Sequence, residues 1–187
     1  RGSWLDGRIG LDTSLFYYSY VDYQIFTAQQ FAGGQPEFVI INANNAEVYG
    51  AEIDAVLRPW VGAFANVRFG WLETQFLDFV QIQQEVISVG GSLVTVNREL
   101  QNTGNPLLNS PRFKVSLSAE QTLPLGRFGS LTARYDGTWT DTTYYDATKG
   151  KGLPNLDNVT FLPDDTIAQR PFWLHNLRLA YRPPQGG

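Results

Sequence analysis

Residues 42–54 read NANNAEVYGAEID. After the asparagines, acidic and apolar side chains alternate: Glu52 and Asp54 stand between Ala51, Ile53 and Ala55. Successive side chains of a β-strand point to opposite faces, so this stretch predicts a strand with one apolar face and one acidic face. In a soluble sheet the apolar face would cover a core. In a membrane barrel it would face lipid, and the acids would face a wet lumen.

Period-two alternation recurs along the chain. Six segments show it: residues 8–26, about 47–58, 63–77, 112–120, 131–140 and 173–182. The second segment keeps Val48 on the apolar face with Ala51 and Ile53 only if the register slips near Tyr49 and Gly50. Helical spacing is not sustained anywhere, so the sequence predicts an all-β protein of about six antiparallel strands in a meander.

Composition narrows the class of protein. The chain has 187 residues, a formal net charge of −4 and no cysteine, so disulfides and thiolate metal sites are excluded. Charges are scattered singly, and without a basic stripe nucleic acid is not an expected partner. Apolar runs reach only about four residues, too short for a transmembrane helix.

The connections between the segments alternate in length. PWVG at 59–62 and LPLGRFG at 123–129 are short, whereas the connections at roughly 27–46, 79–110 and 142–170 are long. Short turns at one end and long loops at the other are the layout of an outer-membrane barrel. Soluble sandwiches rarely need loops of about 30 residues.

Aromatic side chains flank the apolar rows at two levels. Trp4, Trp60, Phe128 and Tyr181 lie beside the short turns, and Tyr17, Trp71, Trp139 and Trp173 lie about eight to ten residues further along their strands. This separation fits one hydrocarbon thickness for tilted strands, with aromatics at both interfaces. The opposite faces are charged. The residues expected to face the lumen are Glu52, Asp54, Arg68, Arg112, Lys114, Arg134 and Arg178.

Four stretches resemble one family. These are FYYSYVDYQ at 16–24, NANNAEVYGAEIDAVLRPW at 42–60, TGNPLLNSPRFKVSLSAEQTLP at 103–124 and YDGTWTDTTYYD at 135–146. In this order they are similar to strands of TonB-dependent outer-membrane receptors. The resemblance implies a 22-strand transmembrane barrel around an N-terminal plug domain, in the bacterial cell outer membrane. Since about six strands cannot close around a plug, we expect residues 1–187 to be a fragment of that barrel domain, with the plug domain and the final strands absent.

The resemblance also implies a function and partners. The full-length receptor would bind a scarce nutrient, such as a siderophore, cobalamin or a saccharide, at its outer loops and import it with TonB-coupled energy. Its partners would be outer-membrane lipid, its own plug domain, the TonB energy-transducing complex through the missing N-terminal part, and the small-molecule ligand. A passive porin-like channel and a soluble β-sandwich carbohydrate-binding module are the alternatives.

Candidate site residues lie in the long connections. Aromatics among Asn and Asp residues can line a ligand vestibule, with loop packing as the alternative. The candidates are Phe31, Phe38, Tyr144, Tyr145 and Phe161. Asp157, Asp164 and Asp165 are either a cation site or solvated loop acids, and they lack EF-hand spacing. His175 shares a row with Trp173, which favours an interface residue over a ligand. We predict no catalytic residues, metal site or cofactor.

Overall fold

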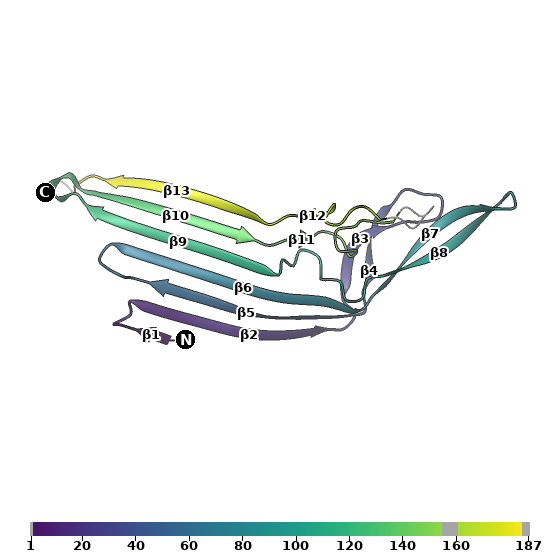
Figure 1. The fold of residues 1–187 in the computed structure, drawn as a ribbon, viewed down its shortest axis with the longest axis horizontal. Helices are drawn as coiled ribbons and strands as arrows, with labels where there is room; N and C mark the ends of the chain where they lie inside the picture. Colours follow the sequence, from purple (N-terminus) through teal and green to yellow (C-terminus); the bar gives the residue numbers. More distant parts are fainter. Residues whose placement is uncertain (1, 155–160, 185–187) are drawn as a thin grey trace.

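The chain folds around one large antiparallel sheet with small hairpins at one end (Figure 1). The computed structural model describes residues 2–154 and 161–184. Within these residues seven strands form the main sheet. In spatial order they are β1 (Gly2–Trp4), β2 (Ile9–Tyr20), β5 (Asn45–Leu57), β6 (Ala63–Asp78), β9 (Phe113–Pro124), β10 (Ser130–Thr140) and β13 (Phe172–Arg182).

The predicted all-β meander is confirmed. Each of the six long strands overlaps one of the six alternating segments, and each pairs antiparallel with the next long strand along the chain. The short β1 adds to the free edge of β2. Among the described residues the sole helical element is the 3₁₀ turn η1 (Gly126–Phe128) between β9 and β10. No helix in this part of the chain is long and apolar enough to cross a membrane.

The two ends of the sheet differ, as the connection lengths predict. Tight turns join the strands at one end, and all three small hairpins lie at or beyond the other end (Figure 1). The hairpins are β3 (Gln24–Gln29) with β4 (Glu37–Asn42), β7 (Val80–Val89) with β8 (Ser92–Gln101), and β11 (Thr143–Tyr144) with β12 (Ala168–Gln169). We call this the loop end, and the opposite end the turn end.

The first segment, predicted as one strand over residues 8–26, is in fact two. β2 stops at Tyr20, and Asp22 takes a left-handed conformation with φ 56°. Tyr23 then leaves the main sheet, because its N–H donates to Asn44 O at 2.8 Å and its carbonyl accepts from Ala43 N at 2.7 Å. The alternation continues into β3 across this break, so periodicity alone did not reveal it.

The asparagines of the opening stretch build that junction. Asn42 Nδ2 donates to Asp22 Oδ1 at 3.1 Å, and Asn42 Oδ1 accepts from Asn44 N at 2.7 Å. Asn44 has φ 48°, a conformation that asparagine tolerates well, and its Nδ2 donates to Asp78 Oδ2 at 3.2 Å. The cluster therefore ties the hairpin β3–β4 to the ends of β5 and β6.

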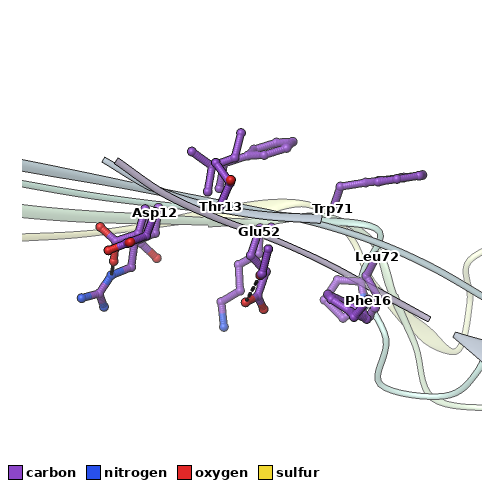
Figure 2. Close-up of a pocket in the computed structure, with 15 residues that line it drawn as sticks. Asp12, Thr13, Phe16, Glu52, Trp71 and Leu72 are labelled. Carbon is purple, nitrogen blue, oxygen red and sulfur yellow. Dashed lines mark hydrogen bonds and ion pairs between the residues drawn. The ribbon is translucent and has the colours of Figure 1, made fainter. Parts of the chain in front are cut away.

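The main sheet has one apolar and one polar face. Register aligns Thr13, Ile53, Phe69 and Val115 in one row, and their neighbours Asp12, Asp54, Arg68 and Ser116 in the next. Figure 2 shows the two sides directly: Thr13 and Trp71 project from one side, and Asp12 and Glu52 from the other. The acids of the opening stretch thus share the polar face, opposite Ile53.

The predicted slip near Tyr49 and Gly50 is wrong. β5 pairs without interruption from Ala46 to Leu57, and its one irregularity lies between Asn45 and Ala46. Unbroken alternation therefore places Val48 on the face of Glu52, not with Ile53. There it packs against the buried cluster at the loop end.

Burial is concentrated at the loop end rather than on the sheet. Along the apolar face Leu15 and Leu177 are 85% and 75% exposed, and within the described residues no second sheet covers that face. The buried apolar cluster sits where the hairpins meet β5 and β6. Its members are Ile25, Ala43, Ala46, Phe76, Phe79, Leu107 and Ala147.

Gly50 offers a test of how closely the strands pack. A Cβ at Gly50 would collide with the Trp71 carbonyl oxygen and would lie 2.8 Å from the Phe16 ring. A Cβ at Gly70, in the neighbouring strand, would meet nothing closer than the Lys114 carbonyl oxygen at 3.9 Å.

We therefore expect Gly50→Ala to destabilise the full-length receptor by about 1–3 kcal/mol, since overpacking forces a backbone shift. Gly70→Ala should change stability by less than about 0.5 kcal/mol. The free energy of unfolding in urea with lipid vesicles measures both. Equal effects of the two substitutions would contradict this packing.

Candidate functional site

The polar face carries a network of charge-assisted hydrogen bonds across neighbouring strands. Arg68 Nε donates to Asp54 Oδ2 at 2.9 Å, and Asn66 Nδ2 donates to Asp54 Oδ1 at 2.5 Å. Ser14 Oγ donates to Glu52 Oε2 at 3.4 Å. Figure 2 shows the shallow hollow of about 600 Å³ at this place. Its lining includes Ser14, Glu52, Asp54, Arg68 and Lys114.

A second group lies further along the same face. Arg134 donates to both carboxylate oxygens of Asp136 at 2.9 Å, the bidentate geometry that suits a guanidinium. Ser118 Oγ donates to Asp136 Oδ1 at 2.6 Å, and Arg134 Nη1 lies 3.6 Å from Glu120 Oε2. Charges of both signs lie along the face, so it is suited to contact water or another polar surface.

The seven residues expected to face the lumen do not all behave alike. Glu52 and Lys114 both pair with Gly70, which has no side chain to separate them. Arg178 lies opposite Arg134 in the register of β10 and β13. With Asp54, Arg68 and Arg134 these residues occupy the polar face.

Arg112 is placed differently. Its Nε lies 2.8 Å from Glu73 Oε2, and its guanidinium lies 5.5 Å from the centroid of the Phe113 ring. Strand alternation places Glu73 and Phe113 on the same face of the sheet as Trp71, which projects from the apolar side (Figure 2). Because Arg112 precedes β9, strand alternation does not fix the direction of its side chain. At the loop end this side chain reaches Glu73 and Phe113 on the apolar side.

A deeper cavity lies among the loops. It has a volume of about 600 Å³, and its lining includes residues of the hairpin β3–β4, residues of the turn at 145–153, and Ile167. Its floor includes Ile25 and Ala147, both buried. We call it the loop cavity.

Two buried glutamines brace the wall of the loop cavity. Gln81 Nε2 donates to Ala28 O at 2.7 Å, and Gln83 Oε1 accepts from Gln30 N. Gln84 N donates to Gln30 O at 2.9 Å. Gln81 and Gln83 are 2% and 0% exposed, so their amides replace water as partners for the edge of β3 and fix it to β7.

Asp146 holds the opposite wall. Its carboxylate accepts from Gly150 N and Gly152 N, both at 2.6 Å, and from Thr148 Oγ1 at 2.8 Å. Thr148 Oγ1 also lies 2.9 Å from Gly152 O. Gly150 and Gly152 have φ of 80° and 68°, conformations that favour glycine. The turn is therefore closed by one carboxylate.

The structure brings together only part of the predicted aromatic set. Phe38 and Tyr145 line the loop cavity, and Phe26, which sequence reasoning missed, stacks on Phe38 with ring centroids 5.4 Å apart. Tyr144 lines a separate hollow of about 360 Å³ with Lys149.

Two other candidates lie outside both of these spaces. Phe31 contributes its carbonyl, which accepts from Gly34 N at 3.2 Å, and Phe161 lines neither space. For Tyr144, burial and then the carboxylate of Asp165 raise the pKa of the phenol above its usual value.

The structure also shows the contacts of His175 and Asp164. His175 Nδ1 lies 2.8 Å from the Tyr135 hydroxyl, and the imidazole stacks on Trp173 with centroids 5.4 Å apart. Asp164 lies 3.5 Å from Lys151 Nζ, and Asp157 falls outside the described residues. In the part of the chain that the structure describes, no three His, Asp or Glu side chains are placed to hold a metal ion.

Comparison with known proteins agrees with this architecture. The family described as TonB dependent receptor-like, beta-barrel matches residues 1–186. Among solved structures, the siderophore receptor PiuA from Acinetobacter baumannii is similar, with a TM-score of 0.53 and 14% sequence identity. The similarity covers 96% of this chain and 20% of that receptor, so the chain spans about one fifth of its length and the likeness concerns the fold. No curated protein matches the chain.

The family match extends over nearly every residue, and the structure supplies the two-faced meander with tight turns at one end and long loops at the other. The chain belongs to the TonB-dependent receptor-like β-barrel family and forms part of such a barrel.

Proposed function

We propose that the chain is part of the wall of an outer-membrane active transporter, which binds a scarce small molecule at the loop end and imports it with energy from TonB. The family consists of outer-membrane receptors and transporters, not enzymes. The polar face would line the lumen and meet the plug domain of the full-length receptor, and the apolar face would meet lipid. Residues 1–187 are on this proposal a fragment of the barrel domain.

The two-faced sheet is the observation that carries the proposal. A broad apolar surface that no other part of the described chain covers is rare on a soluble monomer. Its aromatic residues lie at two levels, with Trp173 and Tyr181 at opposite ends of β13 and Leu177 between them. Aromatic girdles around an apolar band are the pattern of a lipid-facing barrel wall.

The loop end supports a role in binding. Gln81 and Gln83 join hairpin β7–β8 to hairpin β3–β4, and Asp146 closes the turn on the other side, so hydrogen bonds hold the walls of the loop cavity. Cavities of roughly 300–1,000 Å³ with a few placed polar groups are typical small-molecule sites. The loop cavity falls within that range at about 600 Å³.

Substitution of Leu177 tests the lipid-facing assignment. Leu177 is 75% exposed and lies midway between the two aromatic levels of β13. We expect Leu177→Arg to destabilise the full-length receptor in lipid vesicles by about 2–4 kcal/mol, the effect of a charge near the bilayer midplane. On a water-exposed strand the same change would alter stability by less than about 0.5 kcal/mol.

Asn176→Arg is the matched control. Asn176 precedes Leu177 on the opposite face and pairs with Asp136, so an arginine there remains on the polar face. Its effect on the unfolding free energy should be far smaller than that of Leu177→Arg. If the two arginines are equally tolerated, the apolar face does not meet lipid.

Energy-dependent uptake tests the transport proposal. In a bacterium that carries the full-length gene, uptake of three labelled probes is measured: a ferric hydroxamate chelate, cyanocobalamin and a mixture of neutral oligosaccharides. We expect wild-type cells to take up one of the probes. Its uptake should be lost when the gene is deleted, and also when a protonophore collapses the proton gradient in wild-type cells.

The outcomes separate the active transporter from the passive channel. Uptake that needs the gene but continues after the gradient collapses identifies a porin-like channel. If deletion of the gene changes the uptake of none of the three probes, the transport proposal is wrong.

A further inference from the structure

The loop cavity has a chemistry that selects among ligands. Phe26 and Phe38 stack at an interplanar angle of 20° and are 63% and 70% exposed. Tyr145, which also lines the cavity, is 52% exposed. Large aromatic faces left open to solvent are not serving as core, and they offer flat apolar surfaces on which a ring can stack.

Charge is the second selecting feature. Among the described residues that line the loop cavity there is no Lys, Arg or His. The two lysines of the neighbouring turn are directed elsewhere: Lys149 lines the separate hollow beside Tyr144, and Lys151 lies 3.5 Å from Asp164. An anion entering the cavity would thus lose water without gaining a cation.

The single acidic residue of the cavity also disfavours an anionic ligand. Asp146 is the one carboxylate in its lining, and its oxygens already accept from Gly150 N, Gly152 N and Thr148 Oγ1. Its negative charge therefore remains beside the cavity. Removal of a charged ligand from water without a partner is unfavourable, so an anionic chelate is a poor occupant.

Uncharged polar groups remain available. The carboxamides of Gln24 and Asn109 and the hydroxyl of Tyr145 line the cavity. Within the described part of the chain none of these three side-chain groups has a hydrogen-bond partner. Amides and hydroxyls both donate and accept, which matches ligands that carry many hydroxyl groups.

We propose that the loop cavity binds an uncharged, polyhydroxylated ligand, a short neutral saccharide, rather than an anionic metal chelate. The ring faces of the sugar stack on Phe38 and Tyr145, and its hydroxyls exchange hydrogen bonds with Gln24 and Asn109. This assignment rests on the proposed function, because it names the ligand class of the transporter at its loop end.

The test is a binding measurement on the purified full-length receptor in detergent. A glycan array of neutral oligosaccharides gives the probe, and titration calorimetry gives its dissociation constant. We expect at least one neutral glycan to bind, and Phe38→Ala and Tyr145→Ala each to weaken binding about tenfold, in line with the loss of an aromatic contact. Leu93→Ala, at an exposed apolar position on β8 outside the cavity, should leave the dissociation constant unchanged.

Controls keep the result interpretable. Heat-modifiable mobility on gels reports whether each variant is folded, and the conservative Phe38→Tyr should retain binding if ring stacking is the contact. A ferric tris-catecholate chelate serves as the anionic probe, and wild-type receptor should not bind it in the cavity.

Three results would overturn the assignment. They are an array on which no neutral glycan binds, glycan binding that survives both alanine substitutions, and chelate binding that Phe38→Ala weakens. If protonophore-sensitive uptake of the ferric hydroxamate chelate or of cyanocobalamin accompanies any of these, the transporter proposal stands and only the ligand class is wrong.

Discussion

Unbroken backbone pairing between long neighbouring strands is the constraint on which the rest of this structure depends. In hydrocarbon an unpaired N–H or C=O has no water to replace its partner, so a spanning strand must be bonded along its length. β5, β6, β9 and β10 each pair on both sides, over 9 to 13 residue pairs. The close approach at Gly50 follows from this, since a side chain there would push β5 away from the Trp71 carbonyl.

This pairing gives the sheet a polar and an apolar face, and it ends where the strands leave the sheet at the loop end. Because the register holds across β2, β5, β6 and β9, Asp12, Asp54 and Arg68 stay on the polar face and Thr13, Ile53 and Phe69 stay on the apolar face. At the loop end the strands leave the sheet, and there the chain uses side chains to satisfy its backbone. The side chains of Gln81, Gln83 and Asp146 form hydrogen bonds with backbone groups that would otherwise bond to a neighbouring strand. These hydrogen bonds hold the walls of the loop cavity.

Sequence reasoning succeeded where a single physical rule acts over many residues. Alternation over ten or more positions was enough to predict the six long strands, their order and their polar faces. It failed where local geometry decides: the break at Asp22 is a positive-φ turn inside a continuing pattern, and Val48 was misassigned because a slip was assumed at Gly50. The hairpin β7–β8 had a readable signal that was missed, since Gly90 and Gly91 form a two-residue turn between alternating strands. Nothing in the sequence paired Phe26 with Phe38, because that contact depends on how β3 and β4 align.

The most direct test of the account is a nitroxide scan along β9 of a cysteine-free full-length receptor in lipid vesicles, with single labels at residues 114–118. Collisions with dissolved oxygen report lipid exposure, and collisions with a water-soluble nickel complex report aqueous exposure. We expect oxygen maxima at Val115 and Leu117 and minima at Lys114, Ser116 and Ser118, whose side chains share the polar face. A profile with no period of two, or one with its maxima on the polar positions, would contradict the assignment of this sheet to a membrane barrel wall.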